Sequence, residues 1–272
     1  MHTGLTKIIQ RVAKTIGQSQ VTFMADRALA NWFGRYLGKY WQRKYKFELK
    51  KVEVSPSCTA HVLTRIATQV TPEPSRWLMF LHGGGFCMLD PRFYYGLAAH
   101  IARDGRFEGV VIPDFRLSPD FGYPAQLEDC LSTYKWMRDD QKAGKVAIAG
   151  DSSGGNLAAA VTLKKKDTPP EAVALLSPFL DMTISGETYD LNADTDRLVS
   201  KTNATRAAEM YSMCLVNSNQ YQQKSSKRRA RTRSCRPCSL KIFQPFSTPP
   251  SFSFMQVSVK PFCVTRSSST RK

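Results

Sequence analysis

Long apolar stretches and a disulfide pattern are both missing from this sequence of 272 residues. No apolar run approaches the roughly 20 residues of a transmembrane helix, and the N-terminus lacks the continuous apolar core of a secretory signal. The seven cysteines are odd in number and form no secreted-type framework. We therefore expect a soluble chain without a transmembrane segment, in a reducing compartment such as the cytoplasm.

Acidic residues are absent after Glu209, whereas twelve Lys and Arg residues follow it and leave only +5 of the net charge of +17 to everything upstream. Beyond about residue 216, Ser, Arg, Lys, Gln and Pro dominate without helical or strand periodicity. We expect a basic, low-complexity, disordered tail over 217–272, with no specific nucleic-acid partner. The abrupt change also suggests a shifted reading frame or a misjoined exon, with the last strands of the fold missing.

Helical periodicity dominates the first 46 residues. Apolar residues recur at helical spacing over about 5–16, and a second helical stretch over about 24–40 is rich in aromatics. From Phe47 onward, strands and helices alternate, which is typical of βαβ units and predicts an α/β fold with a mostly parallel sheet and helices on both faces. We expect three segments: N-terminal cap helices over 1–46, an α/β core over 47–216, and the tail. The expected strands are 47–54, 60–67, 77–81, 110–113, 146–149 and 172–176, and the expected core helices are 94–103, 125–138 and 156–166.

The sequence Gly-Asp-Ser-Ser-Gly-Gly at 150–155 lies between an expected strand and an expected helix. A G-x-S-x-G sequence at such a turn is the nucleophile elbow, where small residues let the chain turn sharply and the serine hydroxyl project from the sheet. Ser152 is therefore the candidate nucleophile, and the N–H of Ser153, at the helix N-terminus, is a candidate donor to an oxyanion. A glycine-serine turn in a structural loop is the alternative for this motif taken alone. The neighbouring residues that support the motif are Gly150, Asp151, Gly154 and Gly155.

A second glycine-rich loop, His82-Gly83-Gly84-Gly85-Phe86, directly follows the expected strand 77–81. Glycines let backbone N–H groups approach a substrate oxygen closely, and such a loop supplies the other half of the oxyanion hole in lipases and esterases. A plain tight turn is the alternative. Two matching motifs in the right order, each after an expected strand, favour the catalytic interpretation.

The two motifs and the segments between and after them resemble the hormone-sensitive-lipase-like (GDXG lipolytic) family of α/β-hydrolases. Residues 114–119 read DFRLSP where the family has D-Y-R-L-A-P, and residues 123–129 read YPAQLED where it has Y-P-A-A-L-E-D. Residues 177–181, SPFLD, resemble its S-P-W-L-D strand end. The resemblance covers roughly Trp77 to Asp196.

This resemblance implies an α/β-hydrolase fold and hydrolysis of small carboxylic esters with short or medium acyl chains. It implies that Ser152 is the nucleophile and that the N-terminal helices form part of a cap over the acyl pocket. His82 would brace the loop instead of acting as a base. No metal or organic cofactor is implied. The oxyanion donors would be the backbone N–H groups of Gly84, Gly85 and Ser153, with Gly83 as a further candidate.

No histidine follows His100, although the triad of this fold runs Ser, then Asp or Glu, then His along the chain. Neither of the last two members occurs where the family places it. Losing a triad member costs other serine hydrolases several orders of magnitude in rate. We therefore expect an ester hydrolase whose activity is reduced or lost. Two alternatives stay open: a catalytically inactive ligand-binding member of the same fold, and an interaction protein that acts through the basic tail.

Overall fold

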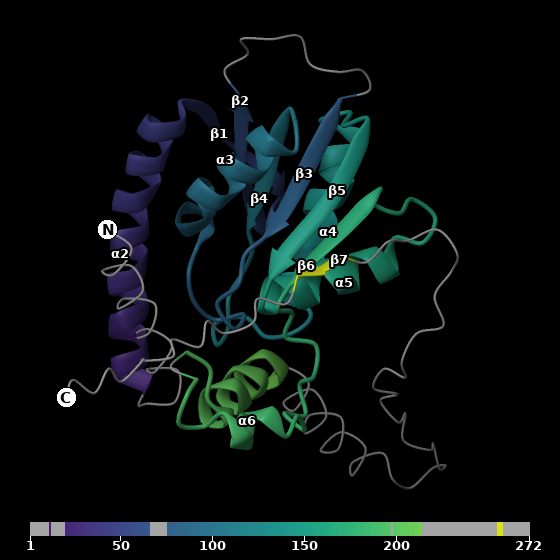
Figure 1. Ribbon diagram of the computed structural model, residues 1–272. Coiled ribbons are helices and arrows are strands. Elements are labelled where there is room, and N and C mark those ends of the chain that lie inside the picture. The colour runs from purple at the N-terminus through teal and green to yellow at the C-terminus, as the bar shows by residue number, and fades with distance from the viewer. Residues whose placement is uncertain (1–10, 12–19, 66–74, 197, 214–254, 258–272) are drawn as a thin grey trace, which may run out of the picture.

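Short apolar segments with β-branched and aromatic residues form one mixed sheet (Figure 1). The computed structural model describes residues 11, 20–65, 75–196, 198–213 and 255–257. Along the sheet the strand order is β1-β2-β4-β3-β5-β6-β7; β1, β2 and β4 pair antiparallel, and all later neighbours pair parallel. The strands are β1 (Phe47–Ser55), β2 (Cys58–Arg65), β3 (Arg76–Leu81), β4 (Gly109–Asp114), β5 (Lys145–Asp151), β6 (Ala172–Leu176) and β7 (Met255–Val257).

The central strands are buried on both faces because helices cover each side of the sheet. Along β3, Met79 faces a core shared with α4 (Ala125–Asp139) and α5 (Ser153–Lys164), whereas Phe80 faces a core shared with α3 (Tyr95–Asp104). The long helix α2 (Gln20–Tyr45) runs along the α3 side of the molecule (Figure 1). Three shorter elements complete the described part: η1 (Pro91–Tyr94), α6 (Thr188–Leu191) and a helix over 201–213.

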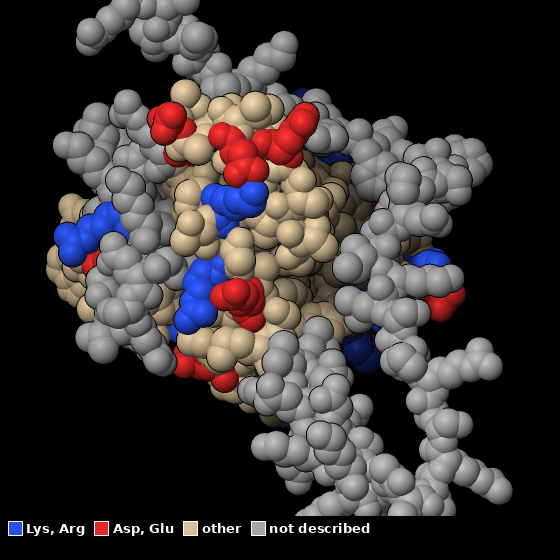
Figure 2. Space-filling model, turned by 90° about the horizontal axis from the view of Figure 1, so that it is seen from below, with Lys and Arg blue, Asp and Glu red and all other residues tan. Residues whose placement is uncertain are grey.

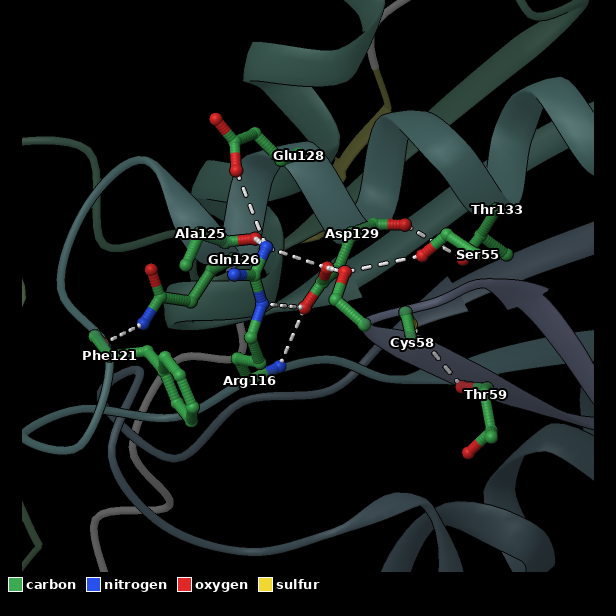
Figure 3. Close-up of polar contacts among 11 residues, drawn as sticks. Ser55, Cys58, Thr59, Arg116, Phe121, Ala125, Gln126, Glu128, Asp129 and Thr133 are labelled. Atoms are coloured by element: carbon green, nitrogen blue, oxygen red, sulfur yellow. Dashed lines mark hydrogen bonds and ion pairs between the residues drawn. The ribbon is translucent and has the colours of Figure 1, made fainter.

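A buried ion pair fixes the loop that follows β4 (Figure 3). The Asp129 carboxylate on α4 accepts hydrogen bonds from the backbone N–H, Nε and Nη2 of Arg116, each at 2.9 Å, and one at 2.8 Å from Ser57 Oγ. The Asp129 side chain is only 1% exposed, so these four donors replace its lost hydration. The network therefore joins the β1–β2 turn, the loop after β4 and α4 into one unit.

The α/β-hydrolase architecture expected from the sequence is confirmed. Each expected strand and helix between residues 47 and 176 is present within a few residues of its expected bounds. The expected helix over 5–16 falls outside the described residues, except for Arg11. Within the segment expected as a tail, Met255–Val257 form β7 beside β6; the division of the chain into cap, core and tail stays a prediction. The rest of 217–272 lies outside the described residues.

Candidate active site

The turn between β5 and α5 holds Ser152 in a backbone conformation that L-residues rarely adopt, with φ +51° and ψ −119°. Two hydrogen bonds keep it there: the Ser152 N–H donates to the Leu176 carbonyl at 3.0 Å, and the Phe179 N–H donates to the Ser152 carbonyl at 2.8 Å. Such a conformation costs on the order of 1–3 kcal/mol and persists where the surrounding structure enforces it, most often at functional sites. Ser152, the candidate nucleophile, therefore lies in a strained strand-to-helix turn.

Glycines at the elbow let α5 begin against the sheet without a gap. A Cβ on Gly154 would lie 2.1 Å from the Leu81 carbonyl oxygen at the end of β3. A Cβ on Gly150 would lie 2.3 Å from the Gly154 carbonyl oxygen. Both contacts are far closer than van der Waals distance, and both involve backbone, which cannot swing away as a side chain can. The spacing of glycines around Ser152 is therefore a packing requirement of the elbow.

The loop after β3 turns tightly at Gly84 and Gly85, which have φ values of +117° and +61°. The Gly84 carbonyl accepts hydrogen bonds from the N–H groups of Cys87 at 3.1 Å and Met88 at 3.0 Å, which closes the turn. Within the part of the chain that the structure describes, the N–H groups of Gly84, Gly85 and Ser153 donate no hydrogen bond. These three N–H groups therefore have no partner within the described part of the chain, which is what an oxyanion hole requires of its donors.

The backbone N–H of Gly83, unlike those of Gly84 and Gly85, already donates hydrogen bonds within the protein. Its N–H donates to Asp151 Oδ1 at 2.8 Å and also lies 3.1 Å from the Tyr94 hydroxyl oxygen. A Cβ on Gly83 would lie 2.4 Å from Asp151 Oδ2, so only glycine fits. The amide of Gly83, expected as a further oxyanion donor, is engaged here and ties the glycine loop to the elbow.

Tyr94 also contacts both Gly83 and Asp151, and no sequence pattern indicated this role. Its hydroxyl donates to Asp151 Oδ2 at 2.9 Å, so both carboxylate oxygens of Asp151 are engaged beside Ser152. Burial raises the pKa of Asp151 to about 6, although the two hydrogen bonds act in the opposite direction. Burial, with the neighbouring Asp151 carboxylate, also raises the pKa of Tyr94 well above its ordinary value, so Tyr94 stays a donor.

A cavity of about 300 Å³ opens beside the elbow. Gly84, Gly85 and Ser152 lie on its floor side, and Asp151 and Tyr94 also line it. Its other walls come from Met88 and Leu89, from the strand end 177–179, and from Tyr189, Leu198, Val199, Asn203, Ala204 and Ala207. The nucleophile candidate and the two glycine amides therefore face one largely apolar pocket.

The sequence of this chain matches a known protein family and several curated proteins. Residues 78–239 match the family model described as alpha/beta hydrolase fold. The chain belongs to this family. Similar curated relatives are an arylacetamide deacetylase of Bos taurus, 35% identical over 40% of this chain and 30% of the relative, and an acetyl-hydrolase of Streptomyces hygroscopicus, 29% identical over 51% and 48%. A carboxylesterase/phospholipase of Mycobacterium tuberculosis, LipF, is 31% identical over 53% of this chain and 39% of the relative.

Solved structures agree with this assignment. The esterase LipW of Mycobacterium marinum aligns with a TM-score of 0.63 at 20% identity, over 72% of this chain and 63% of that one. An esterase from the bacterial hormone-sensitive lipase family aligns with a TM-score of 0.60 at 24% identity, over 76% and 68%. At these identities the structures show the fold. The chain spans less than half the length of the curated relatives named above. The resemblance to the hormone-sensitive-lipase-like family is confirmed.

The roof of the pocket comes from residues 189–207, and no described residue of 1–46 lines the cavity. Helix α2 supports the roof from behind: Phe23 and Ala30 pack with Met88, Ala207 and Met210. Figure 2 looks onto this end of the molecule, where acidic and basic side chains lie side by side on the described surface. Among the described residues of 1–46, α2 thus contributes to the roof by packing behind the glycine loop and the 201–213 helix.

His82 lies inside the protein, only 1% exposed. Its Nδ1 is 2.8 Å from the Gly83 carbonyl oxygen, and its ring stacks on Phe115 with centroids 4.2 Å apart. Burial lowers its pKa to about 4, so the ring is neutral at pH 7. This position suits a residue that braces the glycine loop, and it gives His82 no place on the pocket wall beside Ser152.

The remaining described histidines lie away from the pocket. His61 on β2 is buried, hydrogen-bonds the Tyr95 hydroxyl at 2.6 Å, and has a pKa lowered to about 3, chiefly by burial. His100 on α3 pairs with Tyr45 of α2. His2 lies outside the described residues. Among the residues that the structure describes, no histidine lines the pocket, and no cluster of three or more His, Cys, Asp or Glu side chains is placed to hold a metal.

Proposed function

We propose that this α/β-hydrolase binds small carboxylic esters in the pocket and that Ser152 attacks their carbonyl carbon. The observation that carries the proposal is the strained Ser152 turn, which lines the same cavity as the unengaged amides of Gly84 and Gly85. Three relatives are named for related chemistry: a deacetylase, a carboxylesterase/phospholipase and an acetyl-hydrolase. The function that this site supports best is therefore acyl transfer from an ester to water.

The reaction would proceed in two steps. Ser152 Oγ forms a bond to the carbonyl carbon, and the amides of Gly84, Gly85 and Ser153 hold the negative oxygen that results. Collapse of this intermediate breaks the bond to the leaving alcohol, which takes up a proton, and leaves an acyl-serine that water then hydrolyses. The positive end of α5, which begins at Ser153, favours the developing negative charge.

The weak point of this site is proton transfer from Ser152. No described histidine lines the pocket, so the hydroxyl proton must pass to water, and an unassisted hydroxyl is a poor nucleophile. Serine hydrolases without a working triad retain about 10³–10⁴-fold acceleration over water from the oxyanion hole and substrate binding. We therefore propose slow turnover, with active esters such as aryl esters favoured because their leaving groups need little protonation.

Pocket size limits the acyl group. A volume of about 300 Å³ is at the small end of ligand sites. The apolar roof residues Leu198, Val199 and Ala207 fit hydrocarbon better than charge. We propose short to medium acyl chains, a cytoplasmic location and no metal or organic cofactor in the reaction. Among the described residues, no helix is both long and apolar enough to cross a bilayer.

The test is chemical rescue with imidazole, which can supply the missing base from solution. Hydrolysis of p-nitrophenyl acetate is measured with the purified full chain and with Ser152→Ala, each with and without imidazole, and the uncatalysed imidazole reaction is subtracted. We expect turnover above the Ser152→Ala control that rises with the imidazole concentration. Equal rates for both proteins at every imidazole concentration would reject the hydrolase proposal and favour the ligand-binding alternative. The basic-tail alternative has no described residue in its favour.

A further inference from the structure

Helix α2 has two very different faces. Its inward residues Phe23, Ala30 and Leu37 are buried at helical spacing, and Gly34 and Gly38 lie on the same side. A Cβ on Gly34 would meet the Phe93 ring at 2.6 Å, so the helix lies in direct contact with η1. Among the described residues, the inward face accounts for the packing of α2 on the core, and the outward face has no such packing role.

The outward face carries an exposed apolar ridge. Leu29, Trp32 and Tyr36 recur at helical spacing and are 45%, 63% and 61% exposed. Phe33 stacks against Tyr36 with ring centroids 6.3 Å apart and widens the ridge. Two large aromatic side chains that each keep most of their surface in water, one helical turn apart, are typical of an interaction site.

Cationic side chains continue the same stripe. Lys39 and Arg43 follow Trp32 and Tyr36 by seven residues each, and both are exposed, as are Arg35 and Lys44. Lys44 Nζ lies 5.2 Å from the ring centroid of Trp41, so this cation rests on an aromatic face of the same helix.

No exposed acid on the helix offsets these charges. The one acid of α2, Asp26, is 5% exposed and pairs with Arg11 at 3.3 Å. Over residues 1–45 the sequence has eight Lys and Arg against that single acid. Apolar aromatics beside a surplus of cations on one helix face are typical of a helix that lies in the plane of a membrane interface.

We propose that the outward face of α2 docks the protein onto an anionic lipid surface. The ridge of Leu29, Trp32 and Tyr36 enters the boundary between headgroups and acyl chains, and Lys39 and Arg43 contact lipid phosphates. A second copy of the chain is a poorer occupant, since it would bring a like-charged face against this one. An anionic bilayer complements both the charge and the apolar ridge. The inference does not depend on the hydrolase proposal.

Vesicle binding by the full chain tests this docking. Co-sedimentation is measured with phosphatidylcholine vesicles and with vesicles that also contain about 30% phosphatidylserine, where the surface potential favours basic segments. We expect binding to the anionic vesicles only. Neutralising two charges with Lys39→Gln/Arg43→Gln should weaken binding by about 25-fold, since each near-surface cation contributes about fivefold. Trp32→Ser/Tyr36→Ser keeps every charge and should weaken binding at least about tenfold.

Two controls separate the ridge from nonspecific effects. The variant Leu191→Ser removes a 73% exposed apolar side chain on α6 and should bind as the parent does. A tail variant carries the four substitutions Arg228→Gln, Arg229→Gln, Arg231→Gln and Arg233→Gln. It removes twice as many charges as Lys39→Gln/Arg43→Gln, yet the proposal predicts a smaller loss of vesicle binding from it. Far-UV circular dichroism checks that each variant keeps its helices.

Three outcomes would overturn the proposal. One is vesicle binding that disappears in the tail variant but persists in Lys39→Gln/Arg43→Gln and in Trp32→Ser/Tyr36→Ser. Another is binding to neutral vesicles that is as strong as binding to anionic ones. The third is retention on single-stranded RNA that depends on Trp32 while vesicle binding does not, which would assign the ridge to nucleic acid through base stacking.

Discussion

Asp151 beside Ser152 makes the stability of this protein depend on pH in an unusual direction. Burial raises the pKa of its carboxyl from the ordinary 3.8 to about 6, so the folded protein binds this proton more tightly than the unfolded chain does. The stabilisation from the bound proton is complete below about pH 4 and is lost as the pH rises through about 6. The difference of about two pKa units corresponds to about 3 kcal/mol.

The substitution Asp151→Asn removes this titration and keeps an acceptor for the Gly83 N–H. The free energy of unfolding of the variant, measured by urea denaturation from pH 4 to pH 7.5, should rise relative to the parent by about 3 kcal/mol, mostly between pH 4 and 6.5. The comparison variant is Asp140→Asn, which removes an exposed carboxylate at the end of α4. A parent-to-variant difference that stays constant over this pH range would show that the burial argument is wrong.

Three further outcomes follow from the packing. Asp129→Ala leaves Arg116, which is 23% exposed and still pairs with Glu128, without its buried partner and should lower the free energy of unfolding by about 1–3 kcal/mol; a urea midpoint close to that of the parent would contradict this account. Gly154→Ala places a Cβ 2.1 Å from a backbone oxygen and should lower the free energy of unfolding by at least about 1–3 kcal/mol. The control Gly186→Ala, whose Cβ would have its nearest neighbour at 3.8 Å, should change it by no more than about 0.5 kcal/mol. Thermal melts measure both. Tyr94→Phe removes the donor to Asp151 Oδ2 and should raise the pKa of Asp151 further, as measured by NMR titration of the carboxyl carbon. An unchanged or lower pKa in the variant would contradict this interpretation.

Local sequence patterns predicted most of the fold and the centre of the site. The strand 77–81 is apolar on both faces because helices cover both sides of the sheet, and continuous apolar runs of that length carry a clear signal. Gly150 and Gly154 indicated the turn in the sequence because backbone contacts at the start of α5 leave no room for a side chain at either position. A motif whose residues are dictated by backbone contact can be identified without a structure.

Contacts between distant segments could not be predicted in this way. The tie between Gly83, Tyr94 and Asp151 joins three separate elements, and a lone tyrosine in a helix-like stretch has no pattern that indicates it. The pocket roof over 189–207 depends on how that segment packs against Phe179, which follows β6, and its polar, irregular sequence does not specify this packing. The pairing of β7 with β6 is likewise a long-range contact made by three residues within a stretch of unrelated composition.

The most direct test of the proposed chemistry is intact-protein mass spectrometry after brief exposure to p-nitrophenyl acetate, followed by peptide mapping. If Ser152 attacks the ester and water removes the acyl group slowly, one acetyl group should accumulate on the peptide that contains residues 150–155 and should be absent from Ser152→Ala. An unmodified protein, or acetyl groups found only on lysines to the same extent in both proteins, would contradict the assignment of Ser152 as the nucleophile.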